Sequence, residues 1–313
     1  MIEARGLTKD YGEKRAVDGL TFTVEPGIVT GFLGPNGSGK STTMRLILGL
    51  DRPTVGSVTV NGKQYRDFPA PLHEVGALLE ARAVHTGRSA YNHLLALAHT
   101  HGVPRSRVEE MIDRVGLREV ARKRVGQFSL GMGQRLGIAA ALLADPEILI
   151  LDEPANGLDP EGIKWIRNLL RELAAEGRTV FLSSHLMSEM AQTADHLIVI
   201  GRGRLIADLS VQDFLRQASK NLVRVRAPRS TELADALAGP GVTLTPAPDG
   251  SLEVAGLTAE QVGEAAAANG LALHELTPVT ASLEEAFMDV TRDAVEYHAV
   301  TSEDPAAEPE LAA

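Results

Sequence analysis

Apolar residues in the first 60 positions form short runs rich in β-forming side chains, separated by glycine, proline and asparagine. This pattern predicts strands joined by turns. The predicted strands are residues 20–24, 28–33 and 57–60. A helix is predicted directly after Gly39. Its apolar face consists of Met44, Leu46, Ile47 and Leu50. The order strand, glycine-rich loop and helix is the setting that a phosphate-binding loop requires.

From residue 89 to residue 144 the apolar positions recur at helical spacing. The predicted helices are residues 90–101, 105–115 and 131–143. We interpret this region, about 85–144, as a helical insert in a larger domain that spans residues 1–218. Continuous apolar runs follow at 148–151, 180–183 and 197–200, with a helix predicted at 162–175. Apolar strands that alternate with helices indicate an α/β fold with a parallel sheet covered on both faces.

The pattern changes near residue 218, and residues 219–295 are predicted to form a smaller α+β domain. Its elements follow the order strand, helix, hairpin, helix and strand, which is the βαββαβ order of a ferredoxin-like fold. They are predicted at 222–225, 231–238, 242–245, 251–254, 258–269 and 271–276. Ser282 and Glu285 have the spacing of a capping box that starts one more helix. Residues 296–313 are acidic and without periodicity, so we expect a disordered tail.

The composition favours a globular protein and argues against several other classes. The 313 residues are 44% hydrophobic and 23% charged, which is the balance of a globular protein. A net charge of −10 argues against a broad nucleic-acid footprint. The absence of cysteine excludes disulfides, thiolate metal sites and cysteine nucleophiles. No apolar run approaches the roughly 18 to 20 residues that cross a bilayer, and the N-terminus does not resemble a secretory signal.

One nine-residue segment matches the phosphate-loop pattern G-x-x-x-x-G-K-[ST] followed by threonine. It consists of Gly34, Pro35, Asn36, Gly37, Ser38, Gly39, Lys40, Ser41 and Thr42. Backbone N–H groups of such a loop wrap a phosphate, Lys40 would reach the β- and γ-phosphates of ATP, and Ser41 would hold Mg²⁺. The alternative is an ordinary glycine-rich turn, but the correctly placed helix favours the anion site.

The apolar run 148–151 ends in two carboxylates, Asp152 and Glu153. The carboxyl end of a parallel strand beside a phosphate loop is where Mg²⁺ needs an acidic partner, and we predict Asp152 for that role. Glu153 is the candidate to orient and deprotonate the attacking water. Taken alone, a strand that ends in two acids is as often a solvated edge.

Together with residues 128–135, Phe-Ser-Leu-Gly-Met-Gly-Gln-Arg, these motifs resemble the ATP-binding subunits of ABC transporters over roughly residues 2–215. The resemblance implies a P-loop ABC-type ATPase fold, with a mixed sheet, an antiparallel β subdomain and a helical insert. It implies ATP and Mg²⁺ as cofactors and a homodimer, or a pair with a paralogous ATPase. Ser129 and Gly131 start a second predicted helix with an anion site. In the family, this signature loop closes on the γ-phosphate held by the other subunit.

The resemblance extends to three further residues. Asp159 matches the aspartate of the family's D-loop. His185 follows the run 180–183 and resembles the switch histidine that contacts the γ-phosphate, although a lone histidine is more often a surface residue. Tyr11 matches the aromatic residue on which adenine stacks, with an ordinary packing role as the alternative.

Two positions depart from the family pattern. Glu80, within residues 78–82, replaces the usual glutamine of the Q-loop, and its carboxylate is predicted to reach the metal shell unless it is a loop-surface acid. Leu130 and Met132 replace the more usual glycine and glutamine of the signature loop. With the C-terminal extension, these departures resemble the ATPases of ABC-2 drug and bacitracin-resistance exporters.

The leading hypothesis is therefore an ATPase that powers an exporter of a drug, antibiotic or lipid-like cargo from the cytoplasmic face of the cell membrane. Its membrane permease would be a separate polypeptide, contacted by residues 81–91 and the first insert helix, and no nucleic-acid partner is expected. An ABC ATPase that acts on ribosomes or nucleic acid is the alternative. A module that binds nucleotide without turnover is a third, but Lys40, Asp152 and Glu153 are intact. For the smaller domain we expect dimer contacts or regulation.

Overall fold

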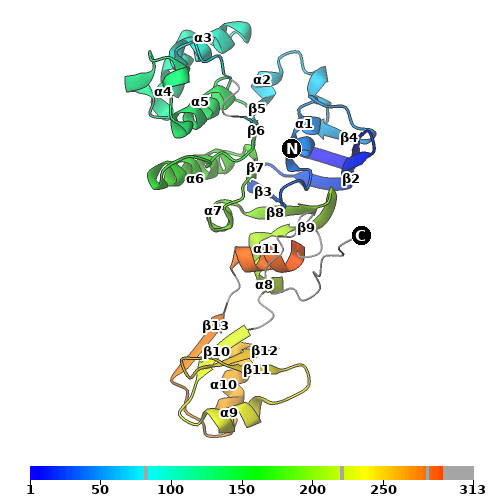
Figure 1. Cartoon of the computed structure of the whole chain (residues 1–313), viewed down its shortest axis with the longest axis vertical. Coiled ribbons are helices and arrows are strands. Elements are labelled where there is room, and N and C mark those ends of the chain that lie inside the picture. Colours follow the sequence, from blue (N-terminus) through cyan, green and yellow to red (C-terminus); the bar gives the residue numbers. More distant parts are fainter. Residues whose placement is uncertain (81–83, 219–221, 280–281, 292–313) are drawn as a thin grey trace, which may run out of the picture.

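A central six-stranded sheet organises residues 1–218 of the computed structural model, which describes residues 1–80, 84–218, 222–279 and 282–291 (Figure 1). The strand order is β5-β6-β7-β3-β8-β9. The bounds are β3 (Val29–Leu33), β5 (Val75–Leu78), β6 (Ile148–Leu151), β7 (Thr179–Ser183), β8 (His196–Gly201) and β9 (Arg204–Ser210). All pairs are parallel except β8 with β9. Every residue of β3, β6 and β7 is buried, which confirms the prediction from continuous apolar runs.

A second, antiparallel sheet packs on one side of the central one. It has the order β2-β1-β4, formed by β1 (Ile2–Tyr11), β2 (Lys14–Val24) and β4 (Val55–Val60). Phe22 of this sheet lies within 6.1 Å of the rings of Phe32 and Phe181, measured between centroids. Strand β1 was not among the predicted strands, since its alternating polar residues and Gly6 hide the apolar face made by Ile2, Ala4 and Leu7.

Five helices of the larger part begin and end close to the predicted residues, whereas those at Pro71–Glu74, Met187–Thr193 and Val211–Ala218 have no predicted counterpart. In chain order, the helices are α1 (Lys40–Ile47), α2 (Pro71–Glu74), α3 (Ala90–Thr100), α4 (Arg105–Arg114), α5 (Leu130–Leu142), α6 (Pro160–Ala175), α7 (Met187–Thr193) and α8 (Val211–Ala218). Helices α3, α4 and α5 form the predicted helical insert, which lies beside β5 and β6 (Figure 1). The placement of Leu50 on the apolar face of α1 is wrong. The helix ends at Ile47, and Leu50 is 57% exposed beyond it.

The smaller domain has the predicted βαββαβ order. Its elements are β10 (Leu222–Arg226), α9 (Ser230–Leu237), β11 (Thr243–Pro246), β12 (Leu252–Ala255), α10 (Ala259–Ala268) and β13 (Glu275–Val279). The sheet order is β11-β12-β10-β13, with every pair antiparallel. The prediction that the last strand starts at Leu271 is wrong. Leu271 is buried, but its N–H closes the end of α10 by bonding the Ala266 carbonyl, so it takes no part in strand pairing.

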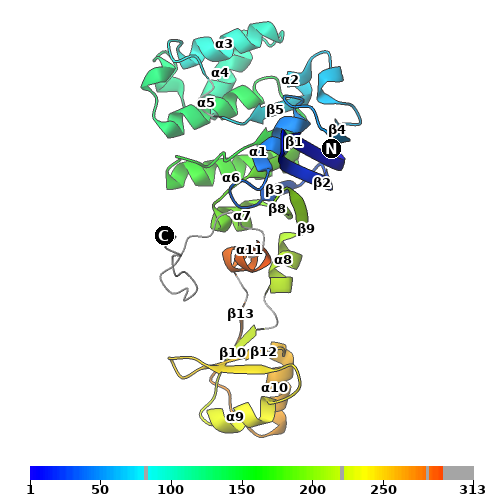
Figure 2. The same ribbon diagram turned by 45° about the vertical axis from the view of Figure 1, so that its right-hand side comes forward.

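The chain returns to the larger part after this domain (Figure 2). Helix α11 (Leu283–Thr291) packs against α8 and α7, and its Leu283 and Ala286 belong to the same apolar core as Phe214 of α8. The predicted capping box is confirmed: Glu285 N–H donates to Ser282 Oγ, and Ser282 N–H donates to the Glu285 carboxylate. The predicted range 219–295 grouped this helix with the smaller domain, whereas its apolar face is buried on residues 1–218.

The predicted acidic tail, residues 296–313, lies outside the described residues. Within the part of the chain that the structure describes, no helix is long and apolar enough to cross a membrane.

Candidate functional site

The loop between β3 and α1 is shaped by glycines at positions where a side chain does not fit. Gly39 has a φ of +104°, and a Cβ atom there would lie 2.5 Å from the carbonyl oxygen of Ala16. A Cβ atom on Gly34 would lie 2.5 Å from the carbonyl oxygen of Ile200. The loop can therefore run close to two neighbouring strands only with glycine at both positions.

Two polar side chains of this loop, Ser38 and Lys40, have the chemistry of an anion-binding site. The side chain of Ser38 is buried, and its Oγ has no hydrogen-bond partner among the described residues. Lys40 Nζ donates to the carbonyl oxygens of Gly34 at 2.6 Å and Pro35 at 3.1 Å. Burial lowers the pKa of the Lys40 ammonium, and the carboxylates of Glu153 and Asp152 oppose that shift. A phosphate at the start of α1 would partner both side chains, so the residues present fit the phosphates of a nucleotide.

Two oxygen groups meet beside this loop. Ser41 Oγ donates to Asp152 Oδ2 at 2.8 Å, and the other oxygen of the same carboxylate accepts from Ser183 Oγ. No cluster of three or more histidine, cysteine, aspartate or glutamate side chains that could hold a metal exists within the described residues. Mg²⁺ suits such a sparse site, because it commonly takes one or two protein oxygens and fills its remaining positions with phosphate and water.

Glu153 and His185 are also brought together, at the carboxyl ends of β6 and β7. His185 Nδ1 lies 2.6 Å from Glu153 Oε2, and the backbone N–H of His185 donates to the same oxygen at 3.2 Å. Glu153 has a φ of +51°, which is unusual for a residue with a side chain. The carboxylate is only partly buried and lines the same cleft as the phosphate loop, and the imidazole that contacts it is exposed.

Tyr11 lies at the open end of the same cleft. Its hydroxyl donates to Asp51 Oδ2 at 2.8 Å, and Lys9 Nζ lies 4.8 Å from the ring centroid. The cleft encloses about 460 Å³ and is lined by Tyr11, Lys14, Ala16, Asn36, Gly37, Ser38, Gly39, Lys40, Ser41, Thr42, Asp152 and Glu153. Lys14 and Ala16 were missed by the sequence analysis. No sequence pattern marks these two residues. They line the cleft because the fold brings β2 against Gly39.

Comparison with known proteins identifies the family. A family model described as "ABC transporter" matches residues 17–156. The chain is 42% identical over 225 residues to the bacitracin transport ATP-binding protein BcrA of Bacillus licheniformis, covering 71% of this chain and 74% of that protein. The chain belongs to the ABC transporter ATP-binding proteins. It is therefore an ATPase built on a nucleotide-binding cassette.

Other relatives of this ABC ATPase extend the likeness to its C-terminal part. The uncharacterized ABC transporter ATP-binding protein YdbJ of Bacillus subtilis is 36% identical over 296 residues, which cover 93% of this chain and 95% of that protein. A second family model, described as a domain of unknown function (DUF8746), matches residues 221–284. Among solved structures, a dimeric ATP-binding cassette bound to ADP and Pi has a TM-score of 0.62 and 25% identity, covering 67% of this chain and 99% of that one.

Seven predicted site residues are not among those that line the cleft of this copy of the ABC ATPase, namely Gly34, Pro35, Glu80, Ser129, Gly131, Asp159 and His185. Ser129 caps α5 by accepting from Met132 N–H at 3.2 Å, and Asp159 caps α6 by accepting from Gly162 N–H at 2.9 Å. A Cβ atom on Gly131 would lie 2.7 Å from the Gly157 carbonyl, so the signature loop packs on the D-loop. Glu80 is exposed just after β5, and the residues that follow it, 81–83, lie outside the described ones.

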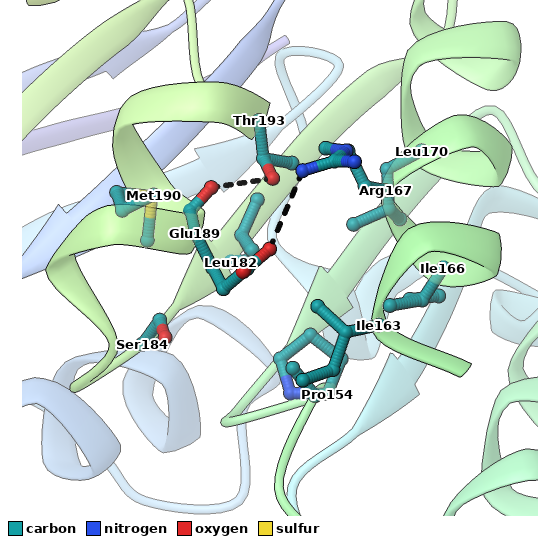
Figure 3. Close-up of a pocket in the computed structure, with 11 residues that line it drawn as sticks. Pro154, Ile163, Ile166, Arg167, Leu170, Leu182, Ser184, Glu189, Met190 and Thr193 are labelled. Carbon is teal, nitrogen blue, oxygen red and sulfur yellow. Dashed lines mark hydrogen bonds and ion pairs between the residues drawn. The ribbon is translucent and has the colours of Figure 1, made fainter. Parts of the chain in front are cut away.

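An apolar pocket lies behind the Glu153 and His185 loops (Figure 3). Pro154 and Ser184, the neighbours of those two residues, line it together with side chains of α6 and α7. Arg167 of α6 and Glu189 of α7 form an ion pair of 3.5 Å at its edge. The Glu153 and His185 loops therefore lie beside helices α6 and α7, with this pocket between them.

Proposed function

We propose that this ABC ATPase powers an ABC-2 type exporter of a drug, an antibiotic or a lipid-like molecule. The support is its likeness to the bacitracin transport ATP-binding protein. A separate membrane permease would carry the cargo, and the ATPase would lie peripherally on the cytoplasmic face of the cell membrane. Residues 81–91 and helix α3 would contact that permease.

The observation that carries the enzymatic part is that Ser41, Asp152 and Glu153 line one cleft, with His185 in contact with Glu153. Ser41 and Asp152 are joined by a 2.8 Å hydrogen bond, and Glu153 and His185 by a 2.6 Å contact. In our proposal, residues 34–42 hold the phosphates of ATP, Tyr11 stacks on adenine, and Ser41 and Asp152 hold Mg²⁺ with Glu80 nearby. Mg²⁺ bound there would offset the negative charge of the phosphates.

Glu153 would accept a proton from the water that attacks the γ-phosphorus, in line with the bond to the departing ADP. His185 would orient the Glu153 carboxylate and contact the γ-phosphate. The Lys40 ammonium would stabilise the charge that develops on the phosphate oxygens. Because burial lowers the pKa of this ammonium, an anionic ligand beside it would favour its charged form.

A second copy would complete the site. Ser129 and Leu130 are exposed at the start of α5, and Asp159 is exposed at the start of α6. Helix starts favour anions through their unpaired N–H groups. We propose that Ser129, Gly131 and Asp159 of one copy close on the nucleotide held by another, so that ATP binding joins two copies and hydrolysis separates them.

The test is purification of the tagged chain from detergent-solubilised membranes of its source cell, followed by reconstitution with any multi-span protein obtained in stoichiometric amount. We expect that protein to raise the ATPase rate in proteoliposomes. The Lys40→Ala variant should show no stimulated ATPase activity in the same proteoliposomes. Recovery of ribosomes or nucleic acid, without a membrane protein, would overturn the transport role and leave the ATPase intact.

A further inference from the structure

The backbone at Glu153 is held in an uncommon conformation by contacts from other elements. Its φ of +51° lies in the left-handed region, where residues with a Cβ atom are rare. The N–H of Glu153 donates to Ser183 Oγ at 3.1 Å, from the end of β7. Its carbonyl oxygen accepts from Asn156 N–H at 3.1 Å within the turn. Such a conformation persists only where its surroundings specify it.

A third group, from the helix that follows the signature loop, completes this arrangement. Gln134 is 3% exposed on α5, and its Nε2 donates to the Glu153 carbonyl oxygen at 2.8 Å. This hydrogen bond directly joins α5, the helix that Ser129 caps, to the backbone of Glu153. Five residues separate Gln134 from Ser129, which is about 7.5 Å along the helix axis.

We propose that Gln134 is a positioning residue for Glu153, which links the start of α5 to the general base of the same copy. The inference rests on the proposed role of Glu153 in hydrolysis. Gln134 and Ser183 bind the carbonyl and the N–H of one residue from two different elements, so they fix the direction in which its side chain leaves the backbone. The Glu153 carboxylate then reaches His185 and the cleft.

The arrangement couples two events in the dimer. The start of α5 would meet the nucleotide of the second copy, while Gln134 on the same helix holds the base that acts on the first nucleotide. A shift of α5 on closure therefore changes the placement of Glu153. Small displacements of a catalytic group have large effects on rate, because the attacking geometry tolerates little error.

The test is Gln134→Met, which keeps the length of the side chain and removes the donor. We expect kcat for ATP hydrolysis to fall about tenfold to hundredfold, with the Kd for ATP within about twofold of wild type. Gln217→Met, on the exposed face of α8, is the matched control and should leave both unchanged. Gln134→Asn keeps the amide but withdraws it by one methylene, and should lower kcat in the same way.

A double variant separates positioning from a general packing defect. In the Glu153→Gln background, Gln134→Met should lower the residual single-turnover rate by less than about twofold, because the group that it positions is already gone. A full additional tenfold loss in that background would overturn the proposal, as would wild-type kcat in both Gln134 variants. Failure of the proposed role of Glu153 would differ from both, since Glu153→Gln alone would then leave kcat undiminished.

Discussion

The nucleotide cleft and the smaller domain differ in backbone conformation and in the arrangement of their polar side chains. In the cleft, the buried Ser38 hydroxyl has no hydrogen-bond partner within the part of the chain that the structure describes, and Glu153 has a left-handed backbone. In the smaller domain, the buried core is apolar, while Arg224 and Glu253 pair at 3.1 Å on the half-exposed face of the sheet. The Nε atoms of Arg224 and Arg226 also have no hydrogen-bond partner among the described residues, so the left-handed backbone is what separates the two regions: no residue other than glycine has a positive φ within residues 222–279.

The largest effect is expected from Glu153→Gln. Loss of the general base should lower kcat about 10²- to 10⁴-fold while ATP still binds, so the ATP-bound dimer should accumulate. Phosphate release and size-exclusion chromatography with ATP would measure both. The same substitution in the smaller domain, Glu264→Gln, should change neither. An undiminished rate in Glu153→Gln would remove the base assignment.

Leu233→Ala in the smaller domain is expected to lower stability and to leave ATP binding unchanged. Leu233 is fully buried in the core of that domain, so its truncation should lower the free energy of unfolding of the domain by about 2–5 kcal/mol. Thermal or urea unfolding, monitored beside ATP binding at 25 °C, would check this. We expect nucleotide affinity to stay at the wild-type value. A large loss of affinity would show that the two regions are tightly coupled.

Lys40→Ala should weaken ATP binding by about 2 kcal/mol, or roughly 30-fold, because it removes charge-assisted hydrogen bonds to the phosphates. Titration with a fluorescent ATP analogue would measure the Kd. Lys164→Ala, an exposed lysine on α6, is the control and should bind normally. Equal affinity in the two variants would contradict the phosphate-loop assignment.

The smallest effect concerns the hairpin of the smaller domain. The hydroxyl and N–H of Ser251 bond the Asp249 carboxylate and lower its pKa to about 2. A carboxyl whose pKa is lower in the folded state stabilises the protein above the unfolded value near 4, and that contribution is lost as the pH falls toward 2. Asp249→Asn should therefore lower the melting temperature slightly at pH 7, and the difference should narrow between pH 4 and pH 2. A constant difference would contradict this.

Much of the fold could be predicted because its elements carry strong local patterns. Strands β6, β7 and β8 are continuous apolar runs, and the capping box at Ser282 marks the start of α11. Strands β5 and β9 could not be predicted in this way. Val75–Leu78 is short and contains Gly76, and Arg204–Ser210 is a half-exposed edge strand with alternating polar residues. Both are strands because of their neighbours in the sheet.

The sequence by itself determined the phosphate loop, the position of two acids at a strand end and the order of elements in the smaller domain. Tertiary structure decided which side chains meet. Ser41 and Asp152 are 111 residues apart, and Glu153 and His185 are 32 apart. They come together because β3, β7 and β6 are neighbours with parallel directions, so their carboxyl ends share one edge. The bond from Gln134 to Glu153 and the return of α11 depend in the same way on packing between distant segments, which no local pattern encodes.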